Sequence, residues 1–179
     1  HGASWSRLLR GRKRRKPRVI SADKQCHAIV GRPEIVNARE RIGDWEGDTI
    51  VGWGGRASLV SLVERVSGYA ELIAVEDRRS ATVIGAVRRR MQTLEPELRQ
   101  TLTFDNGSEF ANHAELKAGL GLDIYFAAPH CPWQRGSNEH LNRLVREFFP
   151  KGSDFRDLSR RKLAEVQRLF NQRPRKRLN

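Results

Sequence analysis

Three β-rich segments follow one another in the first half of this chain, and their order restricts the folds that the chain can adopt. They are residues 45–51, 57–63 and 69–75, and Ser67 and Gly68 supply a turn between the last two. Because a short turn of this kind joins strands that run in opposite directions, we expect an antiparallel hairpin there.

Helical and β-type patterns alternate after these segments. Ser80 can cap a helix that carries Val83, Ile84 and Val87 on one side and ends before Pro96. The other expected elements are a strand at 101–104, a short helix at about 109–117, a strand at 123–126, a helix that contains Glu139 and a helix at about 158–171. This order predicts an α/β protein with one mixed five-stranded sheet and helices on both faces, which resembles the ribonuclease H architecture.

The net charge of +13 is concentrated at the two ends of the chain. Residues 1–20 contain eight Lys and Arg side chains and no acid, and residues 173–179 contain four more. Such blocks attract polyanions such as DNA, although solubility alone is a second explanation. Since residues 1–40 also show little periodicity, we expect a basic, mostly irregular N-terminal extension at 1–40 and one folded core at 41–179.

The sequence gives no indication of a membrane partner or a metal-binding cysteine cluster. No segment has the apolar length of a transmembrane helix, and no apolar stretch follows the basic start as in a signal peptide. Cys26 and Cys131 suggest reduced thiols of a cytoplasmic protein, while a zinc site built from them with His27 and His130 is the alternative. The chain begins with His and ends after a basic run, so we expect a fragment that is truncated at its C-terminus.

Three acids stand where strands end or a helix begins. Asp105 follows an apolar strand, Glu139 lies near the start of an amphipathic helix, and Asp48 lies in the first strand. Carboxylates in such places can hold the pair of divalent metals that cuts or joins a phosphodiester. Two-fold alternation also places Asp44 and Glu46 on the face of Asp48, and Asp105 could be only a turn former, so the residues alone leave these alternatives open.

The helix that carries Glu139 has two distinct faces. Its apolar face is formed by Leu141, Leu144, Val145 and Phe148. Its polar face is formed by Glu139, Asn142, Arg143 and Arg146. The arginines can bind phosphate, or they can pair with neighbouring acids. Trp53 and Trp133 can stack on bases or anchor loops, and Glu109 and Glu147 are expected to be helix-surface charges.

Several longer motifs between Arg32 and Lys176 resemble the integrase core of bacterial insertion-sequence transposases, above all those of the insertion sequence 30 family. The motifs are Trp45–Asp48, Leu62–Arg65, Thr101–Phe110, Tyr125–Pro129, Pro132–Glu139, Phe149–Phe155 and Asn171–Lys176. The resemblance implies a DDE-type, ribonuclease H-like transposase domain that cleaves and joins DNA strands. It assigns Asp48, Asp105 and Glu139 as catalytic residues and as ligands of two Mg²⁺ ions, with Mn²⁺ as a substitute.

The same resemblance implies a bacterial, nucleoid-associated protein that forms homo-oligomers on insertion-sequence ends and target DNA. The helix-turn-helix that precedes the core in full-length relatives is missing. The resemblance and the basic start of the chain together predict a DNA interface. It is made of Arg12, Lys13, Arg14, Arg15, Trp133, Gln134, Arg135, Asn138, Asn142, Arg143 and Arg146.

The chain departs from the family pattern at three positions. Asp44 and His130 replace a usual His and Tyr, and a segment beginning with His140 replaces the usual residues after the catalytic Glu. These changes and the truncated ends motivate an alternative, a catalytically inactive DNA-binding remnant. A general ribonuclease H-like nuclease is a third possibility, and the specificity of the Pro132–Glu139 motif argues against it.

Overall fold

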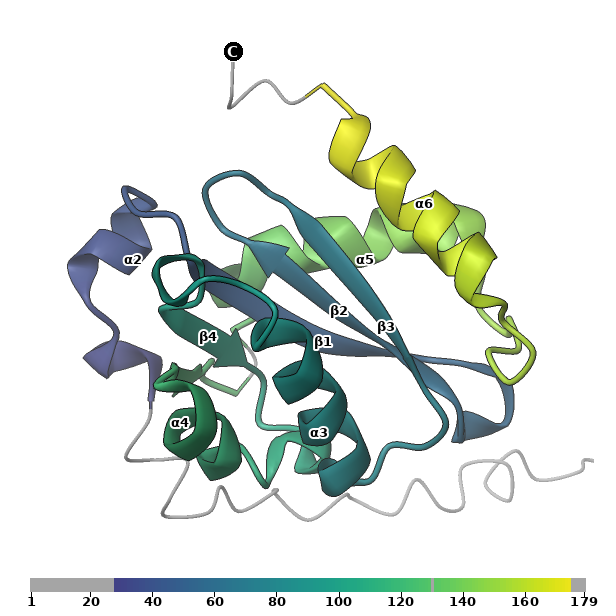
Figure 1. The fold of residues 1–179 in the computed structure, drawn as a ribbon, viewed down its shortest axis with the longest axis horizontal. Helices are drawn as coiled ribbons and strands as arrows, with labels where there is room; N and C mark the ends of the chain where they lie inside the picture. Colours follow the sequence, from purple (N-terminus) through teal and green to yellow (C-terminus); the bar gives the residue numbers. More distant parts are fainter. Residues whose placement is uncertain (1–27, 130, 175–179) are drawn as a thin grey trace, which may run out of the picture.

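The computed structural model describes residues 28–129 and 131–174 and contains one mixed five-stranded sheet (Figure 1). The strand order is β3-β2-β1-β4-β5. The strands are β1 (Asp44–Val51), β2 (Ser58–Glu64), β3 (Ala70–Val75), β4 (Thr101–Phe104) and β5 (Asp123–Phe126). The first three are antiparallel neighbours, whereas β4 runs parallel to both β1 and β5. The expected hairpin and mixed sheet are confirmed.

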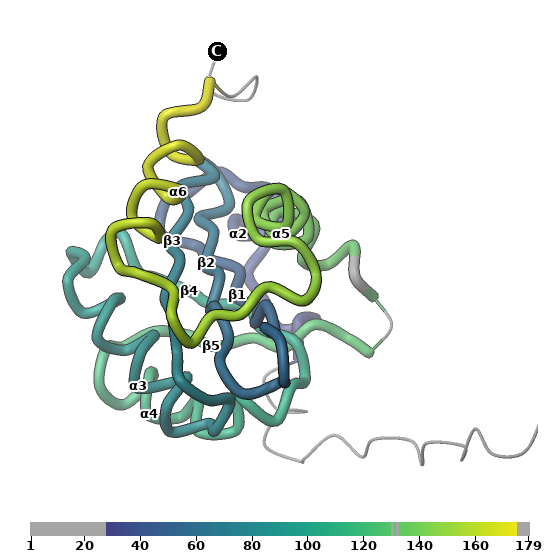
Figure 2. The backbone as a smooth tube through the Cα atoms, turned by 90° about the vertical axis from the view of Figure 1, so that its right-hand side faces the viewer, coloured from purple at the N-terminus to yellow at the C-terminus, as the bar shows by residue number. Residues whose placement is uncertain are grey.

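Helices cover both faces of the sheet, as expected (Figures 1 and 2). Side chains of α3 (Ser80–Met91) and α4 (Ala114–Leu120) share one apolar core with β4 and β5. Side chains of α5 (Gly136–Phe148) and α6 (Arg160–Gln172) share a second core on the other face. Strand alternation divides neighbouring residues between the two cores, so Val60 and Leu62 face one and Leu59 and Val63 the other.

Both edges of the sheet are covered at specific positions. At the β3 edge, Asn171 of α6 accepts a hydrogen bond from the Ala70 amide and donates one to the Ala70 carbonyl, at 2.8 and 2.9 Å. Gln167 accepts from the Leu72 amide at 2.9 Å. At the β5 edge, Ala28 forms a parallel bridge with Phe126. Side-chain amides therefore satisfy backbone groups that an edge strand would otherwise expose.

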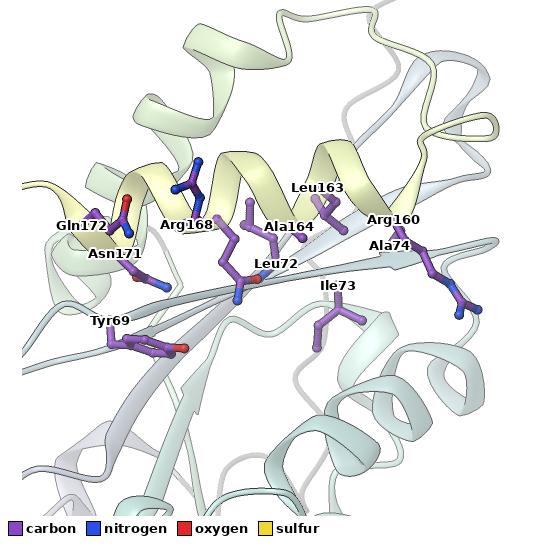
Figure 3. Close-up of a pocket in the computed structure, with 11 residues that line it drawn as sticks. Tyr69, Leu72, Ile73, Ala74, Arg160, Leu163, Ala164, Arg168, Asn171 and Gln172 are labelled. Atoms are coloured by element: carbon purple, nitrogen blue, oxygen red, sulfur yellow. The ribbon is translucent and has the colours of Figure 1, made fainter.

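A shallow pocket lies between β3 and α6 (Figure 3). Its lining includes Tyr69 and Leu72 from the β3 side and Arg160, Leu163 and Asn171 from α6. Because β2 separates β3 from β1, this pocket does not include the acids predicted to be catalytic.

Three local predictions differ from the structure. Ser80 is the first residue of α3, not its cap, and its hydroxyl accepts a hydrogen bond from the Asn112 amide at 2.7 Å. The helix expected at about 109–117 is divided into a 3₁₀ turn, Ser108–Phe110, and α4. Phe148 is 40% exposed, and its ring packs in a T-shaped arrangement with Phe170 of the second core, with 5.4 Å between the ring centroids.

The segment before β1 is more ordered than its sequence suggests. Residues 34–38 form the short helix α2 (Glu34–Ala38), and Val36 and Arg32 are buried. Arg32 donates to the Thr103 hydroxyl of β4 at 3.1 Å. The expected irregular chain is therefore wrong for residues 34–38, where packing on the sheet replaces periodicity as the cause of order. A domain boundary at residue 40 stays a prediction, and the basic residues of 1–20 lie outside the described residues.

Across residues 28–129 and 131–174, none of the helices has both the length and the apolar character that crossing a membrane requires.

Candidate active site

Two of the three predicted catalytic acids meet where β1 and β4 lie side by side. Asp48 is on β1, and Asp105 directly follows β4. Arg135 connects them, because its Nη1 atom lies 3.4 Å from Asp48 Oδ2 and its Nη2 atom lies 3.8 Å from Asp105 Oδ2. The parallel pairing of the two strands thus brings carboxylates together that are far apart in sequence.

Burial distinguishes Asp48 from the two other acids on its strand. Asp44 is buried and accepts a hydrogen bond from the Thr101 hydroxyl at 2.8 Å. Glu46 is fully buried and forms an ion pair with Arg65. The Asp48 side chain keeps 23% of its surface exposed. Of these three acids, Asp48 is therefore the one that a ligand from solvent can reach.

The surroundings of Asp48 both oppose and support its negative charge. Burial raises the pKa of its carboxyl, and the nearby Asp105 charge adds to this effect, while Arg135 and the Thr49 amide act in the opposite direction. The Thr49 amide donates to Oδ1 at 2.8 Å, and Asn142 donates to Oδ2 at 3.0 Å. These donors hold both carboxylate oxygens in place.

The turn after β4 fixes Asp105 in a similar way. Asp105 Oδ1 accepts a hydrogen bond from the Gly107 amide at 2.7 Å, which leaves Oδ2 facing Arg135. A Cβ atom on Gly107 would lie 2.7 Å from Asp105 Oδ1 and from the Glu109 carboxylate, so the turn has no space for a side chain there. Asp105 is a turn former and also presents an oxygen to the site, so the two sequence interpretations are compatible.

Glu109 is not the surface charge that its sequence position suggested. It is buried, and its Oε1 atom accepts hydrogen bonds from the Thr49 hydroxyl and from Arg78, both at 2.8 Å. Although burial opposes the charged form, these donors outweigh it and lower the pKa of Glu109. The 3₁₀ turn directs this side chain inward, and no local sequence signal distinguishes it from an exposed acid. Glu147, by contrast, is exposed as expected.

Glu139 lies in the first turn of α5 with its side chain exposed. Within the described part of the chain, no three His, Cys, Asp or Glu side chains converge closely enough to hold a metal ion. The structure therefore unites Asp48 and Asp105 but leaves Glu139 apart from them. The two united carboxylates already share a cationic group, and oxygen donors of this kind suit Mg²⁺.

The residue before Glu139 anchors the start of α5 to the sheet. Asn138 is fully buried, and its backbone amide donates to Glu46 Oε2 at 2.9 Å. Its side-chain Nδ2 atom donates to the carbonyls of Glu46 and Ser61 at 3.0 and 3.1 Å. The expected contact of Asn138 with DNA is not possible in this structure, because the amide is buried and satisfied within the protein.

The other residues predicted to contact DNA have different surroundings. Trp133 is 71% exposed, and Arg143 is exposed beside His140. Gln134 accepts a hydrogen bond from the Ala128 amide, and Asn142 bonds to Asp48 and Ser61. Arg146 donates to the carbonyls of Val51, Phe149 and Pro150. Arg12, Lys13, Arg14, Arg15 and His130 lie outside the described residues, as do Cys26 and His27 of the alternative zinc site.

Two further sequence alternatives can be compared with these contacts. Neither Arg143 nor Arg146 forms an ion pair with an acid among residues 28–129 and 131–174, so the pairing explanation for these arginines gains no support. Trp53 is 60% exposed, and the Arg156 guanidinium lies 5.3 Å from its ring centroid. Trp53 therefore lies at the surface, where it packs against a cation, and is not part of the core.

Known proteins resemble this chain in both sequence and fold. Residues 38–132 match the integrase core domain family. The chain belongs to the integrase core domain family. This integrase core is 41% identical over 177 residues to the transposase of insertion sequence element IS1086 from Cupriavidus metallidurans, covering 96% of the chain and 52% of the relative. It is 36% identical over 150 residues to transposase InsI of element IS30A from Escherichia coli, covering 84% and 39%.

Solved structures extend the comparison to the fold. The integrase core aligns with a chain of the simian T-cell lymphotropic virus intasome at a TM-score of 0.54 and 17% identity, covering 73% of this chain and 47% of that one. It aligns with the catalytic core domain of BIV integrase at a TM-score of 0.50 and 20% identity, covering 72% and 80%. The predicted ribonuclease H-like integrase fold and the resemblance to insertion-sequence transposases are thus confirmed. The chain spans about half the length of the IS1086 transposase.

Proposed function

We propose that this chain is the catalytic domain of an insertion-sequence transposase, which cleaves DNA strands and joins them to a target during transposition. This proposal rests mainly on one observation: Asp48 and Asp105 lie beside the same guanidinium, that of Arg135, where the parallel strands β1 and β4 are neighbours. The match to transposases along nearly the whole chain supports it.

In this proposal, Asp48 and Asp105 would hold Mg²⁺, and Glu139, which lies apart from them in this structure, would approach to complete the ligands of two ions, which Mn²⁺ can replace. When bound, the ions supply activation of the attacking oxygen and stabilisation of the leaving oxygen in an in-line displacement. The Thr49 amide and Asn142 orient the Asp48 carboxylate through one hydrogen bond to each oxygen. The Gly107 amide holds one oxygen of Asp105 and leaves the other available.

The DNA would pass along the exposed residues near the start of α5. Trp133 offers a ring for stacking, and Arg143 offers a guanidinium for phosphate. The basic residues at positions 12–15 would add phosphate contacts from outside the described core. Since the proposed substrates are insertion-sequence ends and target DNA, we place the protein on the bacterial nucleoid as a homo-oligomer.

The first test uses a nicked, branched DNA that mimics a strand-transfer product, with and without Mg²⁺ or Mn²⁺. The purified chain should cleave or rejoin it only with metal, and Glu139→Gln should lose this activity by orders of magnitude while its circular dichroism stays unchanged. Glu147→Gln is the matched control, because it makes the same change at an exposed site on the same helix.

Full activity of Glu139→Gln would contradict the assigned triad. Cleavage without joining would favour a general nuclease. Salt-sensitive binding with no chemistry in any variant would favour the inactive DNA-binding remnant.

A further inference from the structure

Arg135 occupies a central place in the candidate site, although its sequence position suggested a contact with DNA. It ends the 3₁₀ turn Pro132–Arg135, directly before α5, and its side chain is only 13% exposed. Arg143, on the same helix as Glu139, is exposed instead. The guanidinium of Arg135 is therefore directed at carboxylates within the protein and not toward solvent.

The contacts of this guanidinium are numerous but individually weak. Its Nη atoms lie 3.4 and 3.8 Å from Asp48 and Asp105, which is longer than the roughly 2.7–2.9 Å of a strong charge-assisted hydrogen bond. Its Nη1 atom also donates to the Gly47 carbonyl at 3.2 Å. The Nε atom is buried without a hydrogen-bond partner among the described residues. A cation held in this way can be replaced at modest cost, because few of its donors are fully satisfied.

The position of the positive charge is as important as its strength. Asp48 and Asp105 carry like charges that repel each other unless a cation lies near both. Arg135 is the one side chain that forms ion pairs with both acids within residues 28–129 and 131–174. A divalent ion bound by the same two carboxylates would occupy the space that the guanidinium now fills. It would also supply the positive charge that the guanidinium now provides.

We propose that Arg135 is a positioning residue for the acidic pair, which holds Asp48 and Asp105 in place before metal binds and is displaced by the first divalent ion. This inference rests on the proposed function, because it requires that the two acids bind metal. The guanidinium and the ion then compete for one site, so removing the guanidinium strengthens metal binding. A merely structural arginine would have the opposite effect, because its loss would disorder the site and weaken binding.

The test measures Mn²⁺ binding to the full chain without DNA, by electron paramagnetic resonance of the free ion. Arg135→Gln should bind the first Mn²⁺ about fivefold tighter or more, within the usual range of coupling between two binding events. Arg135→Lys, which keeps the charge, should bind more like the wild type. Arg161→Gln is the matched control, because it removes an exposed arginine on α6 that has no role in the proposed site, and its affinity should not change.

The outcomes separate this inference from the proposed function. Equal or weaker Mn²⁺ binding by folded Arg135→Gln would overturn the inference while leaving the function in place. Binding that persists unchanged in Asp48→Asn, or no binding in any variant, would remove the metal site and with it both proposals.

A second measurement on the wild type covers the case in which Arg135→Gln does not fold. The ¹⁵N resonance of the Arg135 Nε–H group, assigned by its loss in Arg135→Lys, should shift when Mg²⁺ is added. A signal that does not move under saturating Mg²⁺ would overturn the displacement.

Discussion

The Asp48 carboxylate lies in surroundings that raise its pKa, chiefly through burial. The folded protein therefore binds a proton at this group more readily than the unfolded chain does. Stability consequently falls as the pH rises from the ordinary range for Asp through the higher pKa of the folded state. At neutral pH the ionised group lowers the free energy of unfolding, which is the expected balance between function and stability at an acid that we propose to be catalytic.

Asp48→Asn should thus stabilise the protein at pH 7, by about 0.5–2 kcal/mol, while abolishing any metal-dependent activity. The gain should shrink at about pH 4, near the ordinary pKa of Asp, because the raised pKa favours protonation of Asp48 in the folded wild type over the unfolded chain. Urea denaturation at both pH values measures the difference. Asp157→Asn, at an exposed position, is the control and should be close to neutral. A loss of stability at pH 7 would show that the hydrogen bonds to Asp48 outweigh its burial.

Individual residues show how far the sequence can specify such a site. Two-fold alternation correctly groups Asp44, Glu46 and Asp48 on one face but does not indicate which of them is open to solvent. That choice depends on partners from other strands, because Arg65 pairs with Glu46 and the Thr101 hydroxyl bonds to Asp44. Glu109 was mistaken for a surface charge for the same reason, since its partners are distant in sequence.

Helix α5 shows what periodicity reveals and what it omits at the scale of one element. Its apolar face was predicted, and Leu141 and Val145 are buried in the second core. Its polar anchor at Asn138 was not predicted, because hydrogen bonds to the Glu46 and Ser61 carbonyls have no helical period. This anchor sets the position of Glu139, the next residue.

Asn138→Ala should lower the free energy of unfolding by about 1–3 kcal/mol, because it leaves buried carbonyls without a donor. For a chain of this size, each kcal/mol corresponds to a decrease in Tm of roughly 2–4 °C. Thermal unfolding by circular dichroism measures this decrease. Glu147→Ala, on the exposed side of α5, should be nearly neutral. If Asn138→Ala also were neutral, α5 would not depend on this anchor.

Across the whole molecule, the positive charge is unevenly distributed. Eight basic side chains and no acid lie in residues 1–20. If they contact phosphates, their removal should reduce the steepness with which DNA affinity falls with salt.

Deleting residues 1–20 should lower the slope of log affinity against log salt by about 0.9 for each phosphate contact that is lost. Fluorescence anisotropy with a labelled duplex, across a series of salt concentrations, measures both slopes. A chain in which the order of these residues is scrambled should keep the wild-type slope, since the effect depends on charge alone. An unchanged slope after deletion would assign DNA binding to the core.

The order of elements was enough to predict a mixed five-stranded sheet with helices on both faces, because short connections and strand handedness leave few arrangements. The order of the strands within the sheet was not predicted. The segment before β1 escaped prediction because its order comes from long-range packing. Arg32 reaches Thr103 on β4, and Ala28 bridges to Phe126 on β5. The approach of Asp48 to Asp105 was inferred through the resemblance, whereas Arg135 between them appeared only in three dimensions.

The covered edges of the sheet have a consequence for assembly. An open edge strand invites a neighbouring molecule to add its own strand, and such unions are hard to reverse. Here Asn171 and Gln167 occupy the β3 backbone groups of Ala70 and Leu72, and Ala28 occupies part of β5. In the proposed oligomer on DNA, these covered positions would not be open to strand addition between copies, so a contact there would involve α6 or the segment at Ala28 and leave the sheet intact.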